Sequence, residues 1–143
     1  MKRIRRGPTG AGATRPPWSA LIRAARAVRA NAHAPYSRYQ VGAAVLDEQG
    51  RIHVGCNVEN VSYGLTVCAE RNAVAAAVAA GASSLRAVAI ASEDARAPAP
   101  PCGACRQVLA ELAAADVPVI LLGPRGAGRR HRLGDLLPHA FGS

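Results

Sequence analysis

The sequence contains no apolar run long enough to cross a membrane. The longest such run, Ala73–Ala80, is far shorter than the roughly 20 residues that a membrane-spanning helix needs. The first residues also lack the apolar stretch of a secretory signal peptide. We therefore expect a cytoplasmic protein without a membrane partner.

Aromatic residues are scarce as well, at 3% of a chain of 143 residues of which 50% are hydrophobic. A core with so few rings must be built mostly from Ala, Val and Leu, which suits close helix packing and favours oligomerisation. The length fits one domain with a substantial core that needs no disulfides. Four cysteines could form two disulfides, but that pattern is typical of secreted domains, so metal ligation is the better interpretation.

The first 15 residues contain no acidic residue and carry a charge of +5. The rest of the chain therefore carries +4 of the formal net charge of +9. The basic residues among the first 15 are Lys2, Arg3, Arg5, Arg6 and Arg15. Because they are mixed with Gly, Pro and Thr, the composition predicts a disordered basic tail over residues 1–16 and one domain over 17–143. Such a tail can bind nucleic acid, but a solvated end is its commoner role, and we do not expect a nucleic-acid partner.

Hydrophobic periodicity predicts that strands and helices alternate along the chain. The expected helices cover residues 18–30, 67–80 and 103–114. The expected strands cover residues 41–46, 51–57, 85–91, 117–122 and 129–133, followed by a turn at 135–137. The first two strands are joined by a hairpin turn and should be antiparallel neighbours, and the alternation as a whole favours a layered α/β fold.

Three of the four cysteines lie in two short segments that open predicted helices. Cys102 and Cys105 form a CxxC pair, whose sulfurs share one side of a first helical turn, and Cys68 precedes Glu70 by two residues. Three protein ligands leave a zinc position for water, whereas a structural site is normally closed by four. Helix N-termini also stabilise thiolates. The spacing predicts a catalytic zinc site with Glu70 as proton carrier, and Arg71 as a charge partner for the thiolates.

A structural zinc site is the competing interpretation, with Cys56 as a fourth ligand. We disfavour it because the sequence has no second CxxC pair and because Cys56 lies within a predicted strand, where a buried thiol is expected. Arg71 and Arg106 could also be ordinary solvated charges on their helices.

Several separate motifs resemble the small homotetrameric cytidine deaminases from about residue 17 to the C-terminus. These motifs are Ala34–Ser37, Val41–Ala44, Gly55–Asn60, Cys68–Arg71, Pro101–Val108, Leu136–Pro138 and Phe141. A Cys or His, then x-Glu, then PCxxC is the signature of zinc nucleobase deaminases. The resemblance implies a three-layer α/β/α sandwich around a mixed sheet of about five strands. It also implies one zinc ion per subunit and a homotetramer.

The same resemblance implies an enzyme, a hydrolase acting on the C–N bond of a cyclic amidine. Its reaction in pyrimidine salvage converts cytidine and 2′-deoxycytidine to uridine and 2′-deoxyuridine plus ammonia. Cys68, Cys102 and Cys105 match the zinc ligands, and Glu70 matches the proton shuttle. In this chemistry zinc activates a water for attack on C4 of the cytosine ring, while the glutamate protonates N3 and then the departing amine.

The resemblance also implies substrate contacts. Asn57 and Glu59 match a pair that binds ribose hydroxyls, and the backbone of Ala69 matches a contact to the base. Tyr39 stands where the family usually has a Phe that packs on the base, and Phe141 matches an aromatic residue contributed by a neighbouring subunit. By residue type alone, Asn57 and Glu59 could equally be turn residues, and the two aromatics could belong to a core or an interface.

Two alternatives stay open at this point. One is a deaminase of the same fold that acts on another aminopyrimidine nucleoside, of blasticidin type, or on a base in a polynucleotide. Glu59 favours a free nucleoside, because its carboxylate would collide with a phosphate-linked 3′ position, and Cys68 in place of His favours the small tetrameric class. The other is a zinc-stabilised module that binds nucleic acid through the arginine-rich tail.

Overall fold

Five strands form one mixed sheet in the order β2-β1-β3-β4-β5. The computed structural model describes residues 14–94 and 97–142, so most of the expected tail over residues 1–16 lies outside the described residues. The strands are β1 (Gly42–Asp47), β2 (Ile52–Cys56), β3 (Leu85–Ala91), β4 (Pro118–Leu122) and β5 (Arg129–Arg132). Strands β3 and β4 are parallel, and the other three neighbouring pairs are antiparallel, including the expected β1–β2 hairpin.

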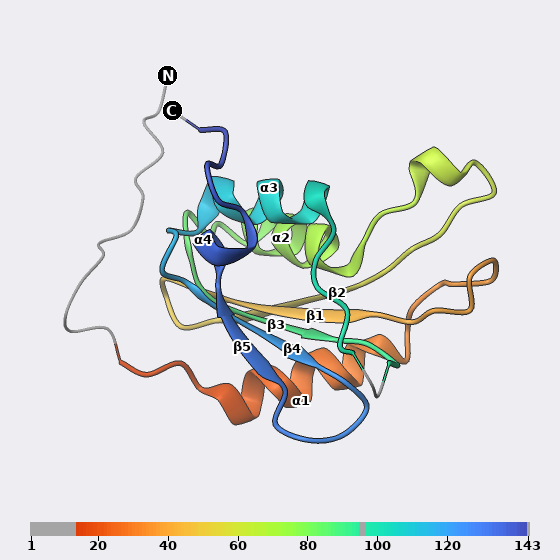
Figure 1. The fold of residues 1–143 in the computed structure, drawn as a ribbon, viewed down its shortest axis with the longest axis horizontal. Helices are drawn as coiled ribbons and strands as arrows, with labels where there is room; N and C mark the ends of the chain where they lie inside the picture. The colour runs from red at the N-terminus through yellow and green to blue at the C-terminus, as the bar shows by residue number, and fades with distance from the viewer. Residues whose placement is uncertain (1–13, 95–96, 143) are drawn as a thin grey trace.

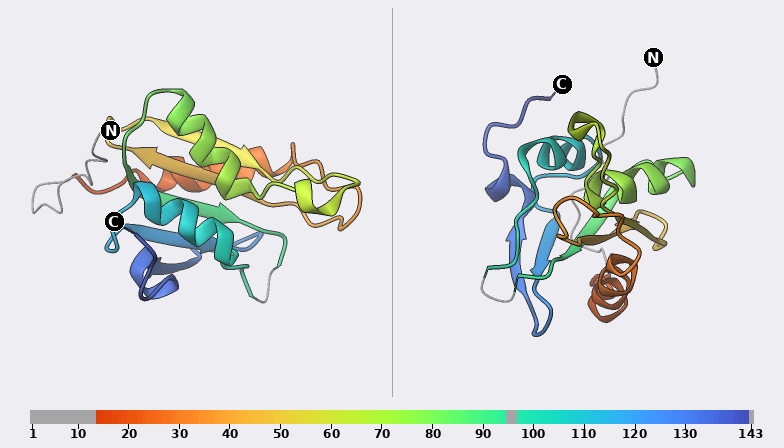
Figure 2. Two further views of the ribbon diagram at one scale, coloured as in Figure 1. Left: turned by 90° about the horizontal axis from the view of Figure 1, so that it is seen from above. Right: turned by 90° about the vertical axis from the view of Figure 1, so that its right-hand side faces the viewer.

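Helices cover both faces of this sheet (Figures 1 and 2). Helix α1 (Trp18–Arg29) packs on one face, and α2 (Ala69–Ala79) and α3 (Gly103–Leu112) pack on the other. Successive side chains of the central strands point to opposite faces of the sheet and pack into a hydrophobic core on each face. Every residue of β1 is therefore buried. The predicted three-layer α/β/α sandwich with a five-stranded mixed sheet is confirmed.

Most of the expected boundaries lie within two residues of the observed ones, and β3 coincides with its prediction. The predicted turn near the C-terminus is a one-turn helix, α4 (Leu133–Leu136), and the irregular stretch before α2 contains a 3-10 turn, η1 (Tyr63–Leu65). Gly81 follows α2 at φ 90°, a left-handed conformation that suits glycine and ends the helix as predicted. Among the helices of the described residues, none has the length and hydropathy required to span a membrane.

Two strand glycines let helices approach the sheet closely. A Cβ atom on Gly55 of β2 would lie 2.3 Å from the amide nitrogen of Ala73 and 2.6 Å from the carbonyl oxygen of Ala69. A Cβ atom on Gly42 of β1 would lie 2.1 Å from the carbonyl oxygen of Ala25 in α1. Because any larger residue at position 55 would push α2 away, Gly55 sets the position of the first turn of α2.

Candidate active site

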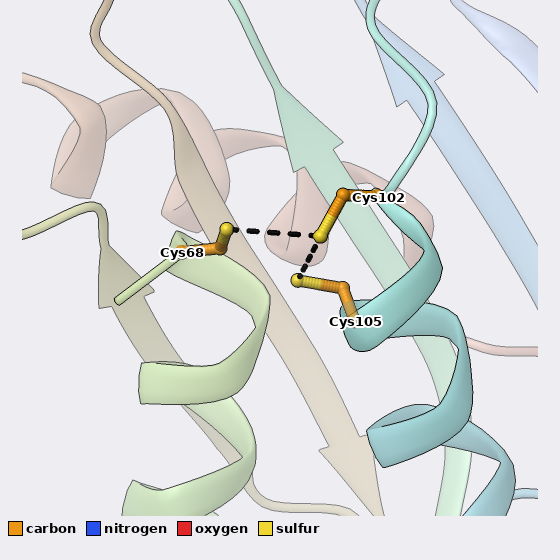
Figure 3. A group of neighbouring side chains, drawn as sticks. All are labelled: Cys68, Cys102 and Cys105. Atoms are coloured by element: carbon orange, nitrogen blue, oxygen red, sulfur yellow. Dashed lines mark hydrogen bonds between the residues drawn. The ribbon is translucent and has the colours of Figure 1, made fainter. Parts of the chain in front are cut away.

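Three cysteine side chains converge where the N-termini of α2 and α3 meet (Figure 3). Cys68 is the N-cap of α2, Cys102 is the N-cap of α3, and Cys105 lies in the first turn of α3. The Sγ atoms of Cys68 and Cys102 are 3.9 Å apart, and those of Cys102 and Cys105 are 3.5 Å apart. The prediction that both cysteine segments open helices is therefore confirmed, and the structure brings the three sulfurs together.

The sulfur triangle has the dimensions of a tetrahedral zinc site. Zn–S bonds of about 2.3 Å at tetrahedral angles place ligand sulfurs roughly 3.8 Å apart. The three Sγ atoms all lie within 4.8 Å of one another, so small side-chain adjustments would bring them to that spacing. Cys56, at the end of β2, is not part of this cluster, and it is half-buried rather than buried as expected. The arrangement offers three thiolate ligands and leaves a fourth zinc position to a water or substrate atom.

The surroundings of Cys68 favour its thiolate form. A hydrogen bond from the Cys105 thiol lowers the pKa of Cys68 to about 5, with Arg71 acting in the same direction and burial opposing both. Nη2 of Arg71 lies 3.9 Å from Sγ of Cys68 and also donates to the carbonyl of Thr66 at 3.1 Å. The same hydrogen bond, together with burial, raises the pKa of Cys105, which keeps its proton until a metal displaces it. Arg71 thus has the contact expected of a charge partner.

Glu70 occupies the first turn of α2, two residues after Cys68, and is 5% exposed. Burial raises the pKa of its carboxyl, and the charge on Cys68 adds to this effect. The Glu70 amide, the Cys105 thiol and the Arg71 charge oppose the rise without cancelling it. A carboxyl in this environment holds a proton at a higher pH than a solvated glutamate does, which is the property a proton shuttle needs.

Asn57 is buried directly after β2 and fastens the loop that precedes β1. Its Oδ1 accepts a hydrogen bond from the amide of Val41 at 2.8 Å, and its Nδ2 donates to the carbonyl of Tyr39 at 2.8 Å. Each group has capacity for one further hydrogen bond, so the amide can hold the loop and still bind a ligand. Asn57 thus has a structural role in holding the loop, and its predicted contact with a ribose hydroxyl stays a prediction.

Glu59 fastens an earlier part of the same loop. Its carboxylate accepts hydrogen bonds from the amides of Tyr36 at 2.9 Å and Ser37 at 3.1 Å, and from the hydroxyl of Ser37. The hydroxyl contact is the main cause of a lowered pKa at Glu59, so this group is ionised at neutral pH. An ionised carboxylate is a strong acceptor for hydroxyl groups of a ligand.

A pair of backbone hydrogen bonds joins the segment that carries Asn57 and Glu59 to the segment that leads into the cysteine site. The amide of Val58 donates to the carbonyl of Val67 at 2.9 Å, and the amide of Val67 donates back at 3.0 Å. Val58 lies between Asn57 and Glu59, and Val67 directly precedes Cys68. The residues predicted to hold the sugar therefore stand on a backbone segment paired with the one that carries a predicted zinc ligand.

The remaining predicted contacts have different surroundings. Ala69 is the buried first residue of α2, so its backbone stands between Cys68 and Glu70. Tyr39 is half-buried in the loop that Asn57 holds. Phe141 is 89% exposed, and its carbonyl accepts a hydrogen bond from Gln107 at 2.9 Å. Its expected role in the site of a neighbouring subunit stays a prediction.

Some residues that shape the site carried no assigned role in the sequence. Nδ2 of Asn72 donates to the carbonyl of Cys56 at 2.9 Å and so joins the first turn of α2 to the end of β2. Gly55, in the same strand, permits the close helix contact described above. The available signals were a polar residue on an alanine-rich helix and a glycine inside a strand, and both point to close tertiary contacts.

A three-layer fold that places three cysteines and a buried glutamate at two helix N-termini is that of the zinc-dependent deaminases. A family model described as the cytidine and deoxycytidylate deaminase zinc-binding region matches residues 18–121, and the chain belongs to this family. The predicted family is therefore confirmed.

Named relatives and solved structures agree with this assignment. The chain is 48% identical to the cytidine deaminase of Halalkalibacterium halodurans over 121 residues, which cover 85% of this chain and 91% of that protein. It is 47% identical to the cytidine deaminase of Mycobacterium tuberculosis over 126 residues, which cover 87% and 90%. A crystal structure of the Burkholderia pseudomallei cytidine deaminase superposes with a TM-score of 0.82 at 49% identity, and covers 86% of this chain and 98% of that one.

Proposed function

We propose that this protein hydrolyses cytidine and 2′-deoxycytidine to uridine and 2′-deoxyuridine with release of ammonia, as an enzyme of pyrimidine salvage. The observation that carries the proposal is the sulfur triangle, with spacings of 3.5 and 3.9 Å, beside the buried carboxyl of Glu70. Relatives that are 45% to 48% identical and are named cytidine deaminases support the same reaction.

Cys68, Cys102 and Cys105 would hold one zinc ion per subunit, since three thiolates at tetrahedral spacing suit this metal. When bound there, zinc would supply a water that loses a proton readily and can then attack C4 of the cytosine ring as a nucleophile. The carboxylate of Glu70 takes the proton of that water and delivers it to N3 of the ring. It then takes the second proton of that water from the hydroxyl now on C4 and gives it to the amino group, so that the C4–N bond breaks, ammonia leaves and the C4 carbonyl forms.

The substrate would bind to the segment that follows β2 and to the loop that precedes β1, both close to Cys68. At the ribose hydroxyls, the carboxylate of Glu59 would accept hydrogen bonds and the amide of Asn57 would donate or accept them. The backbone of Ala69 would hold the base. The ring of Tyr39 would pack against the base, and Phe141 would reach the site from a second subunit. This last contact belongs to the further proposal that the protein is a homotetramer located in the cytoplasm.

An ammonia-release assay on cytidine, 2′-deoxycytidine and free cytosine tests the proposal. Both nucleosides should be turned over, whereas cytosine should react far more slowly because it lacks the ribose that Asn57 and Glu59 would bind. Release of no ammonia from either nucleoside, together with editing of a single-stranded polynucleotide, would overturn the proposal. Light scattering on the same preparation measures whether the protein is a tetramer.

A further inference from the structure

Arg106 directly follows Cys105 on α3, and its guanidinium joins two distant parts of the chain. Nε donates to the carbonyl of Pro101 at 2.7 Å, and Nη1 donates to the carbonyl of Leu136 at 2.6 Å. Pro101 is buried and immediately precedes Cys102, while Leu136 is the last residue of α4. Arg106 is therefore not the solvated helix charge that its position in the sequence allowed.

The hydrogen bond from Arg106 to Pro101 acts next to Cys102, the least constrained of the three cysteines. Cys105 is fully buried inside the first turn of α3, and Cys68 is held by Arg71. Cys102 is exposed and stands at the N-cap, where no side-chain hydrogen bond caps the helix. Its orientation depends on the peptide that enters it from Pro101, and Arg106 holds the carbonyl of that peptide.

The second acceptor of Arg106, the carbonyl of Leu136, is held firmly in place. The carbonyl of Leu136 is one of the helix-end acceptors that lack a partner within their own helix, and an arginine satisfies such a group well. Leu133 and Leu136 of α4 pack against the core beneath α3, so the anchor point has little freedom. A planar guanidinium can donate to two carbonyls at fixed directions at once, whereas an ammonium group cannot match both directions in the same way.

We infer that Arg106 is a positioning residue that ties the Pro101–Cys102 peptide to the end of α4 and thereby holds Cys102 in a zinc-retaining geometry. The inference rests on the proposed function only in taking the three cysteines as zinc ligands. Gln107, the next residue on α3, provides a matched control. It also holds the C-terminal segment, through the carbonyl of Phe141 at 2.9 Å, whereas the hydrogen bond to the carbonyl of Pro101 comes from Arg106.

The test measures zinc retention in the intact protein and in the variants Arg106→Gln, Arg106→Lys, Gln107→Ala and Arg23→Gln. Release of zinc to an excess of chelator, followed with a colorimetric zinc indicator, should be at least about tenfold faster in Arg106→Gln, because residues that orient metal ligands typically contribute this much to metal affinity. Arg106→Lys should give an intermediate rate. Gln107→Ala and the exposed control Arg23→Gln should release zinc at the rate of the unmodified protein.

Cobalt substitution supplies a second readout, since the thiolate-to-cobalt absorption reports ligand geometry. This absorption should change in both Arg106 variants and stay the same in the two controls. If Arg106→Lys releases zinc at the unmodified rate with an unchanged cobalt spectrum, the inference is wrong even where its melting temperature falls. Arg106→Lys also decides the question should Arg106→Gln fail to fold. Absence of zinc from the unmodified protein would instead overturn the proposed function, and this inference with it.

Discussion

The two ends of α2 are associated with buried carboxylates in opposite environments. At its N-terminus, the buried position of Glu70 raises the pKa of the carboxyl. At its C-terminus, Arg51 joins the carbonyl of Ala80 at 3.0 Å to the carboxylate of Asp47 at 2.8 Å. Asp47 is fully buried, yet its pKa is lowered to about 2, because hydrogen bonds from His53, Arg51 and Gln49 together outweigh the effect of burial.

The difference shows how hydrogen-bond donors separate a structural carboxylate from a reactive one. Asp47 accepts from the amides of Gln49 and Arg51 at 2.9 Å, and its second oxygen lies 2.8 Å from Nε2 of His53. These donors stabilise the charged form, so the group stays ionised and holds the β1–β2 turn against α2. Glu70 has fewer opposing donors and a thiolate neighbour, so it can gain and lose a proton during a reaction.

Removing a zinc ligand should have the largest effect, confined to the zinc site where the N-termini of α2 and α3 meet. Cys102→Ala leaves two thiolates, so we expect loss of bound zinc and of all measurable deamination. Cys56→Ala is the matched control, because Cys56 lies outside the sulfur cluster, and it should keep both. Metal analysis and an ammonia assay check the outcome, and full zinc content in Cys102→Ala would refute the ligand set.

Glu70→Gln should separate proton transfer from metal binding at the same end. The amide is close in size but cannot carry a proton, so turnover should fall by about 10²- to 10⁴-fold, the usual contribution of a general acid–base group. Zinc content and melting temperature should be retained, because Glu70 is not among the clustered sulfur ligands. Steady-state kinetics and metal analysis measure both effects. Loss of zinc from a folded variant would show that its role has been misassigned.

The fold was predictable where the pattern of apolar residues is long and uniform. The apolar runs of β1 and β3, and the alanine-rich helix ended by Gly81, correspond to elements of the observed structure. The order of the strands was not predictable, because the parallel β3–β4 pair depends on how α3 packs on the sheet. The single turn of α4 is too short to carry a period.

The cysteine spacing predicted three ligands on two helix ends, and the sulfur cluster agrees with it. Spacing specifies the residue types that a metal needs, but it says nothing of contacts between distant segments. Asn57 reaches Tyr39 across 18 residues of chain, and Arg106 reaches Leu136 across 30. Such hydrogen bonds exist only once the layers are packed, so the supporting residues around the site emerge from the structure.

At the C-terminal end of α2, Asp47→Asn should weaken the fold and leave the chemistry intact. The amide keeps the shape but loses the charge that Arg51 and His53 contact, so we expect the free energy of unfolding to fall by about 2 kcal/mol. Zinc content and turnover of the folded enzyme should stay unchanged, in contrast with Glu70→Gln. Chemical denaturation and steady-state kinetics test this. A loss of turnover as large as that of Glu70→Gln would show that the carboxylates at the two ends of α2 do not have separate roles.

The smallest expected effect is the pH dependence of that stabilisation. The folded-state pKa of Asp47, at about 2, lies below its ordinary value of 3.8, so the stabilisation is complete above the ordinary value and is lost as pH falls toward 2. The stability difference between the unmodified protein and Asp47→Asn should therefore shrink by about 1–2 kcal/mol between roughly pH 5 and pH 2. Denaturation of both proteins at each pH measures this difference, and zinc loss in acid affects both alike. A difference that stays constant with pH would mean that the Asp47 charge contributes nothing to the fold.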